Sequence, residues 1–317
     1  MPVTVEQLPL FSLPSNEPTP AARPVGAAGL QAAASLKAAI VAWCEHLERE
    51  GARPNTVKAF GGDLRLFASY AGAGRPLNQI ATRDLEKWLQ TQKALGRSPK
   101  TYARRITSLK AFFRWLEQSG VLAQDPAAAI VQQTVLSPLP VVLTDDEVER
   151  AKEAARRLWQ GAERPDLRPY LLFTLLLHTG IKKSECLNLE LNHIDTSAPE
   201  EPVLWIRYKE TRDRYKERKL RLDAAWLQTY QAYLALHRPE QRLFPYQARR
   251  LEYLLEDITV AAGLDKHISF EMCRWTCAVR DARAGLDFDR IRQKLGLSKI
   301  QWREIGMKLK KLTEPGL

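Results

Sequence analysis

Several features that would assign this 317-residue sequence to a particular class of protein are scarce or missing. No run of apolar residues approaches the roughly 18 that a membrane-spanning helix needs, so we expect no membrane span. The first residues lack the basic and then apolar order of a secretion signal. The four cysteines are scattered and show no metal-ligand spacing, which indicates reduced thiols in a cytoplasmic protein.

Motifs for small-ligand chemistry are missing as well. The sequence has no glycine-rich phosphate loop and no cluster of histidine and cysteine, so it predicts neither a nucleotide cofactor nor a metal ion. Positive charge, in contrast, is abundant: 48 Lys and Arg residues outnumber 37 Asp and Glu residues, which gives a net charge of +11. A basic protein with 45% hydrophobic residues can form a core, and its first candidate partner is nucleic acid.

Composition and periodicity divide the chain into four parts. Residues 1–32 are rich in Pro, Ala, Ser and Thr and predict a flexible tail. Residues 33–128 show four helical runs with short connections and carry 15 basic against 8 acidic residues. Residues 129–142 contain two prolines and predict a linker. Residues 143–317 predict a second domain, which is helical except for a strand pair at 203–209 and 215–222.

Capping residues predict where the helices of the first domain begin. Thr82 is expected to cap the third helix, and Ser98 followed by Pro99 is a cap with a first-turn proline for the fourth. An apolar stripe then runs along the fourth helix: Tyr102, Ile106, Leu109, Phe113 and Leu116. Four basic residues are expected to lie away from this stripe: Lys100, Arg104, Arg105 and Arg114. Such a face suits DNA phosphates, or it is simply a solvated helix surface.

Five segments carry the most recognisable patterns in the sequence. They are "RPNTVKAFGGDLRLFASY" and "SPKTYARRITSLKAFFRWLEQSGVLAQDPA" in the first domain, and "LLLHTGIKKSECLNLELNHID", "ISFEMCRWTCAV" and "IRQKLGLSKIQWREI" in the second. The first two are similar to the core-binding half of the tyrosine recombinase family, which includes the phage integrases and the Xer-like recombinases, and the other three resemble its catalytic segments. The resemblance implies a mainly α protein with a small β-sheet, built from a four-helix SAM-like core-binding domain and a mixed α/β catalytic-type domain.

The family cleaves DNA with a tyrosine hydroxyl that attacks a phosphodiester. Two arginines neutralise the phosphate oxygens, where charge builds up in the transition state. A lysine on a strand turn protonates the leaving oxygen, and two His or Trp positions assist. By resemblance, Lys182 occupies the first arginine position and Arg274 the second. The strand-turn lysine corresponds to Lys209, or to Asp213 when the turn is aligned from its other end.

The remaining catalytic positions carry residues that differ from the family pattern. Glu271 stands at the His of His-x-x-Arg, Leu297 at the next His or Trp position, and Gly306 at the nucleophile. Tyr253 is the final tyrosine, so no shift of alignment brings a tyrosine into the C-terminal segment. The sequence therefore predicts a protein that is not an enzyme. Two alternatives stay open: a tyrosine supplied by a partner protomer, or another nucleophile among four nearby residues. These are Cys273, Thr276, Cys277 and Ser298.

DNA contacts are predicted from the basic residues of both domains. In the first domain they are Lys58, Arg65, Lys100, Arg104, Arg105 and Arg114. In the second they are Lys182, Lys183, Lys209, Arg212, Arg214, Lys216 and Arg274. Alternatively, Lys182 and Arg274 form ion pairs with Glu185 or Glu271, and the 208–219 hairpin is a solvated surface.

Two terminal segments predict further contacts. "QLPLF" resembles the peptide with which bacterial proteins bind the β sliding clamp, and it implicates Gln7, Leu8, Leu10 and Phe11. The alternative is an apolar patch that packs on the protein itself. Near the C-terminus, Ile305, Leu309 and Leu312 predict an amphipathic helix interrupted by Gly306. It either mediates assembly or covers its own domain.

These observations predict a cytoplasmic, nucleoid-associated protein that binds double-stranded DNA. Its expected role is accessory, targeting or regulatory, in the transposition or recombination of a mobile element. The expected partners are other recombination proteins, the sliding clamp and further copies of the chain on DNA. A third hypothesis is an interaction protein that has lost DNA binding.

Overall fold

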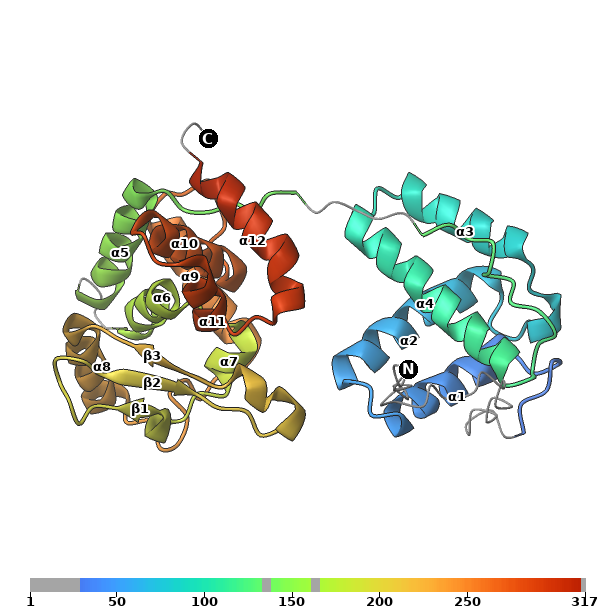
Figure 1. The fold of residues 1–317 in the computed structure, drawn as a ribbon, viewed down its shortest axis with the longest axis horizontal. Coiled ribbons are helices and arrows are strands. Elements are labelled where there is room, and N and C mark those ends of the chain that lie inside the picture. The colour runs from blue at the N-terminus through green and yellow to red at the C-terminus, as the bar shows by residue number, and fades with distance from the viewer. Residues whose placement is uncertain (1–28, 133–137, 161–165, 315–317) are drawn as a thin grey trace, which may run out of the picture. The chain divides into compact units, whose positions relative to one another are not determined.

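A computed structural model describes residues 29–132, 138–160 and 166–314 (Figure 1). The chain divides into two compact units between residues 137 and 138, and each unit has its own hydrophobic core. The proposed clamp-binding residues Gln7, Leu8, Leu10 and Phe11 lie outside the described residues. None of the helices described in these ranges is long and apolar enough to span a bilayer.

The N-terminal unit is a bundle of four helices around aromatic side chains. The helices are α1 (Leu36–Arg49), α2 (Pro54–Ala71), α3 (Thr82–Ala94) and α4 (Pro99–Gln118), with a 3-10 turn at Leu77–Gln79. Phe67, Trp88, Phe112 and Phe113 are almost completely buried and contact one another edge to face. This arrangement confirms the prediction of a four-helix domain.

Capping explains two of the helix starts, one as predicted and one not. The Ser98 hydroxyl accepts a hydrogen bond from the Thr101 amide at 3.3 Å, as expected for an N-cap before Pro99. The prediction that Thr82 caps α3 is wrong, because α3 begins at Thr82 itself. The Asp84 carboxylate accepts a hydrogen bond from the Ala81 amide at 2.9 Å, so a residue within the first turn satisfies the N–H group at the start of the helix.

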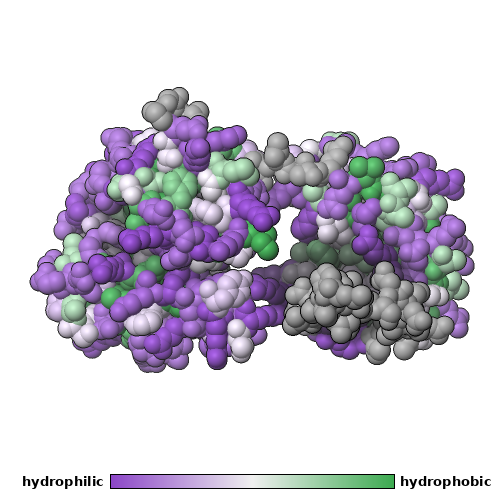
Figure 2. Space-filling view, in the orientation of Figure 1, coloured by the Kyte–Doolittle hydropathy of each residue, from purple (hydrophilic) through white to green (hydrophobic). Residues whose placement is uncertain are grey.

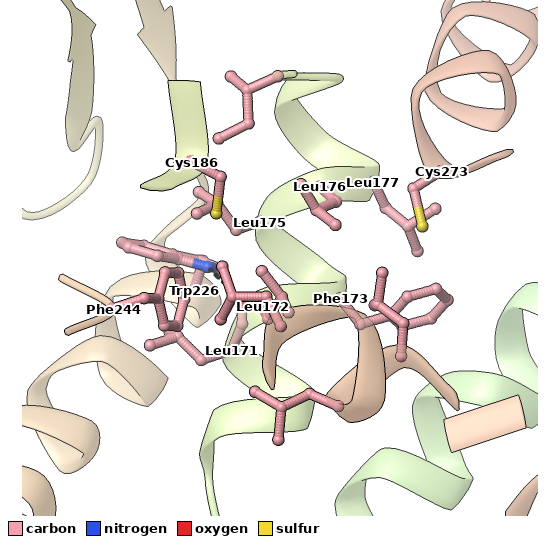
Figure 3. Close-up of a cluster of buried hydrophobic side chains, with 14 of the residues drawn as sticks. Leu171, Leu172, Phe173, Leu175, Leu176, Leu177, Cys186, Trp226, Phe244 and Cys273 are labelled. Atoms are coloured by element: carbon pink, nitrogen blue, oxygen red, sulfur yellow. Dashed lines mark hydrogen bonds between the residues drawn. The ribbon is translucent and has the colours of Figure 1, made fainter. Parts of the chain in front are cut away.

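The C-terminal unit is built around helix α6 (Arg168–Thr179), whose residues 171–177 are all buried. A helix that is apolar on every side must be covered on every side. It packs against α5 (Asp145–Gln160), α8 (Ala224–His237), α9 (Ala248–Ala261) and α10 (Phe270–Arg283). Figure 3 shows Leu171, Leu172 and Phe173 of α6 among these neighbours, together with Trp226 and Phe244.

Three short strands form a small antiparallel sheet with the order β1-β2-β3. They are β1 (Ile194–Asp195), β2 (Val203–Ile206) and β3 (Arg218–Arg221). The predicted strand pair is therefore present but shorter at the connecting end than expected. Residues Thr211–Lys216 form a 3-10 helix instead, in which the Asp213 carboxylate pairs with the Lys216 ammonium three residues later.

Further helical segments complete the unit. They are α7 (Lys183–Leu187), a 3-10 turn at Leu191–His193, α11 (Phe288–Lys294) and α12 (Lys299–Thr313). The prediction that Gly306 interrupts the last helix is wrong, because α12 continues through it. A single glycine inside a helix costs only about 1 kcal/mol relative to alanine. Leu309 is fully buried against α10 and α11, so α12 covers its own unit.

Candidate functional site

A buried carboxylate lies at the centre of the candidate site. The Glu185 side chain, on α7, is 1% exposed and accepts two hydrogen bonds from the Arg218 guanidinium, both at 2.9 Å. It also accepts from the Tyr208 hydroxyl and, at 2.8 Å, from the Lys182 amide. Burial raises the pKa of Glu185, but the bonds and charge of Arg218 outweigh burial and bring the pKa to about 2. Glu185 is therefore ionised at neutral pH.

Arg274 connects the ends of two helices beside this carboxylate. Its guanidinium donates to the Gly180 carbonyl, just after α6, and at 2.5 Å to the Leu295 carbonyl, just after α11. Burial lowers the pKa of Arg274 to about 10, so the group stays positive at neutral pH. The predicted alternative of an ion pair with Glu271 is not observed, because Glu271 is exposed in the first turn of α10.

Lys182 immediately precedes α7 and is half-buried near the same group of charges. Burial lowers the pKa of Lys182 to about 8; the negative charge of Glu185 opposes this shift, and three nearby cations add to it. Those cations are Arg274, Lys216 and Arg218. Three cations, Lys182, Arg218 and Arg274, thus lie around the Glu185 carboxylate, and the excess of positive charge suits the binding of a phosphate group.

Two of the predicted DNA contacts lie inside the protein, which corrects the prediction for them. Arg105 has a 7% exposed side chain, 3.7 Å from the Asp63 carboxylate, and it donates to the Gln92 side chain. Lys216 has an 8% exposed side chain and pairs with Asp213 at 2.5 Å. A buried cation needs an internal partner, and one that is paired in this way is not presented to a phosphate on the surface.

The other predicted contacts lie at least partly on the surface. Exposed in the N-terminal unit are Lys58, Arg65, Lys100, Arg104 and Arg114. Exposed in the C-terminal unit are Lys209, Arg212 and Arg214, whereas Lys182, Lys183 and Arg274 are half-buried. Arg104 links α4 to α2 through Asp63 at 2.8 Å, and Lys183 pairs with Glu252 at 2.6 Å. Figure 2 shows that hydrophilic side chains dominate the visible face of each unit.

The four alternative nucleophiles are buried or already engaged. Burial raises the pKa of Cys277 to about 11 and raises that of Cys273 further. The Thr276 hydroxyl is buried and accepts from the Leu143 amide at 3.0 Å, while the Ser298 hydroxyl caps α12. None of the four combines exposure with an ionised or activated group.

Helix α12 is closely packed around Gly306, which the resemblance places at the position of the family nucleophile. A Cβ atom added to Gly306 would lie 3.1 Å from the Trp302 ring, so a larger residue there requires the indole to shift. Leu297, just before α12, is buried in the core of α10, α11 and α12. In the part of the chain that the structure describes, no group of three His, Cys, Asp or Glu side chains is arranged to hold a metal ion.

Sequence reasoning treated Arg218 as one of several cations that could bind phosphates and did not identify it as the partner of Glu185. It is one of several cations in a charged stretch, and nothing in the local pattern separates it from its neighbours Lys216 and Lys219. Only its pairing with Glu185, 33 positions earlier, distinguishes it. Glu185 was considered only as a partner for Lys182 or Arg274.

Two family descriptions match the sequence on either side of the unit boundary. "Phage integrase, N-terminal SAM-like domain" matches residues 40–120, and "Phage integrase family" matches residues 141–305. The second match alone covers more than half of the chain. This chain belongs to the tyrosine recombinase family.

Similar recombinases are found among proteins and solved structures. Tyrosine recombinase XerC of Mycobacterium sp. (strain KMS) is 30% identical over 266 residues, which cover 80% of this chain and 87% of that protein. XerC of Mycobacterium leprae is 38% identical over 157 residues, covering 48% of this chain and about half (52%) of the relative. The Tn1549 transposon integrase, solved with transposon right end DNA, shares the fold with a TM-score of 0.65 at 19% identity. That match covers 89% of this chain and 96% of the integrase.

Family membership corrects one prediction. The expectation that the chain is not an enzyme is contradicted, because its relatives are named tyrosine recombinases, and these are enzymes. The resemblance places Glu271, Leu297 and Gly306 at positions where this chain departs from the family pattern, and these departures alone carry no conclusion about activity.

Proposed function

We propose that this recombinase-family protein binds double-stranded DNA and takes part in the recombination or transposition of a mobile element, as an accessory or targeting subunit. The observation that carries the proposal is the group of cations around Glu185, which includes Lys182 and Arg274 at the family's two arginine positions. The Tn1549 integrase, of similar fold, is recorded in complex with transposon end DNA, which supports the same kind of partner for this chain.

The N-terminal unit adds a surface suited to the phosphate backbone. Helices α2 and α4 pack against each other, and Arg104 of α4 reaches the Ala59 carbonyl of α2 at 3.2 Å. The exposed cations of these two helices are Lys58, Arg65, Lys100, Arg104 and Arg114. Contacts of this kind position a protein on DNA without reading its sequence.

The C-terminal unit contributes the connection between β2 and β3. Lys209, Arg212 and Arg214 are exposed there, and Tyr215 next to them is 67% exposed. Lys216 lies 5.1 Å from the Tyr215 ring centre and 5.7 Å from that of Tyr208, whose hydroxyl bonds Glu185. The exposed connection is thus held beside the buried charges. We propose that it contacts DNA phosphates while Lys182 and Arg274 receive one phosphate.

The test is the retention of duplex DNA by the purified full chain. We expect salt-sensitive binding to fragmented host DNA, with enrichment of element ends if the protein recognises a site. The double variant Lys58→Glu with Lys100→Glu, two exposed lysines of α2 and α4, should weaken binding by about tenfold or more. Lys87→Glu, an exposed lysine of α3, serves as the matched control. No retention by the unaltered protein would overturn the proposal.

A nicked suicide substrate in the same experiment addresses strand cleavage. A covalent adduct that forms only when a second recombinase is present would identify a tyrosine supplied by a partner protomer. An adduct with this chain alone would show a nucleophile within it, and peptide mapping would locate the residue. Either result rejects a purely accessory role.

The tail peptide is proposed as a tether to the sliding clamp. It combines Gln7 with Leu10 and Phe11, an amide and two apolar side chains suited to a shallow pocket. We expect a fluorescent peptide of residues 4–14 to bind purified clamp, and the version with Leu10→Ala and Phe11→Ala to lose most of that binding. Equal binding of the two peptides would reject the tether.

A further inference from the structure

A basic hollow of about 540 Å³ lies beside strand β3. All four residues of β3 line it, together with Leu286 and three residues of α11. The full lining is Arg218, Lys219, Leu220, Arg221, Leu286, Arg290, Gln293 and Lys294. Five of these eight residues are Lys or Arg and none is acidic, so the lining favours a negatively charged occupant. We call it the edge hollow.

Backbone geometry adds a second feature, because β3 is the last strand of the sheet. The Leu222 amide donates to the Pro202 carbonyl at 2.8 Å, and Leu220 lies opposite Leu204 in the same register. In an antiparallel pair, hydrogen-bonded positions alternate along the strand. The N–H and C=O groups of Lys219 and Arg221 therefore point away from β2, toward the free edge. Such an edge is a template for another strand.

The cations of the edge hollow differ in how far they are already neutralised. Arg218 pairs with Glu185, and Lys294 pairs with Asp281 at 2.7 Å. Arg221 has only an exposed partner, Glu201, at 3.5 Å. Within the described ranges, Lys219 and Arg290 form no ion pair. They therefore remain available to an acidic ligand, one on β3 and the other on α11.

We propose that the edge hollow binds an extended acidic segment of a partner protein, which pairs with β3 as a fourth strand. The free backbone groups of Lys219 and Arg221 supply the strand pairing, and Lys219 and Arg290 supply charge complementarity. The C-terminal helix of a second copy has the wrong charge for this site, since α12 carries Lys308, Lys310 and Lys311. This inference does not depend on DNA binding.

The first test measures charge. A fluorescein-labelled peptide of alternating Glu and Val is titrated with the full chain, and fluorescence polarisation is recorded. We expect saturable, salt-sensitive binding that Arg290→Glu weakens by about tenfold, because an attraction becomes a repulsion. Arg250→Glu, an exposed arginine of α9 outside the edge hollow, should leave binding unchanged. If a peptide of alternating Lys and Val binds as tightly as the peptide of alternating Glu and Val, the proposal is overturned.

The second test measures strand pairing. Two peptides of the same sequence are N-methylated at alternate residues, so that each loses the N–H groups of one edge. We expect one of them to lose binding and the other to keep it, since only one edge faces β3. On the protein side, Lys219→Pro removes an outward N–H group that Lys219→Thr retains. Both variants lose the lysine charge, so only the proline variant should also lose the affinity that strand pairing contributes.

These measurements also separate a strand acceptor from a plain anion site. Equal binding of both methylated peptides, together with displacement by sodium triphosphate, would show a phosphate site and reject the proposal. Thermal unfolding of each variant, compared with the unaltered chain, identifies any loss that arises from misfolding. The methylated peptides leave the protein unchanged, so their comparison stands even if Lys219→Pro does not fold.

Discussion

Replacing Arg218 with methionine should lower the stability of the C-terminal unit by about 3–5 kcal/mol, because it leaves the buried Glu185 carboxylate without its cation. Methionine retains much of the arginine stem, so the main loss is electrostatic. For a unit of this size the midpoint of thermal unfolding should fall by about 6–20 °C. Circular dichroism or calorimetry of the full chain measures the shift.

Two controls identify the cause of that shift. Arg221→Met removes a neighbouring arginine whose side chain is 79% exposed, and it should change stability by no more than about 0.5 kcal/mol. Adding Glu185→Gln to Arg218→Met removes the unpaired carboxylate charge and should restore part of the lost stability. If the single and double variants are equally stable, the loss comes from packing and not from the carboxylate.

The same variant should show a characteristic dependence on pH. Folding depresses the pKa of Glu185 from 4.5 to about 2, so its ionic contribution is present above pH 4.5 and disappears as the pH falls through 2. The stability difference between the unaltered chain and Arg218→Met should therefore shrink as the pH is lowered from 5 toward 2. A constant difference over that range would contradict the ion-pair explanation.

Raising the pH from 7 to 9 should weaken DNA binding by up to about tenfold, through the loss of the charge on Lys182. Burial holds the pKa of Lys182 at about 8, so its ammonium is mostly present at pH 7 and mostly lost at pH 9. A bound phosphate favours the charged form of Lys182. Above pH 8, Lys182 must therefore take up a proton when the DNA binds. Fluorescence anisotropy with a short duplex, at constant ionic strength, measures the change.

The matched variant for this prediction is Lys182→Arg. A guanidinium stays charged throughout this range, so the dependence between pH 7 and 9 should become much weaker. If the variant retains the full dependence, another group titrates on binding, and Lys182 does not contact the phosphate. The DNA-binding proposal itself is decided separately, by the affinity at pH 7.

Local patterns predicted much of the fold. The cap at Ser98, the proline at 99 and an apolar stripe were enough to define α4. Such signals act over a few residues, and packing reinforces them. Helix α3 shows the limit, since its start depends on Asp84, inside the helix, and not on Thr82.

Arg105 was misplaced although the sequence contains the signal that places it. It precedes Leu109 by four residues, and helix geometry puts such residues on one face. That face is buried, where Asp63 of α2 lies near Arg105 and Arg104. Counting basic residues identified a charged helix correctly, but it did not separate the cations that face solvent from one that faces the core.

The sequence alone determined the family, the two-part organisation and the positive charge, because these depend on short motifs and on composition. Only the tertiary structure decided which charges form the site. Glu185, Tyr208, Arg218 and Arg274 lie on separate elements, and the packing of α7, β3 and α10 brings them together. The interaction of two charges depends on their separation in space and on their burial, and neither is encoded by their spacing along the chain.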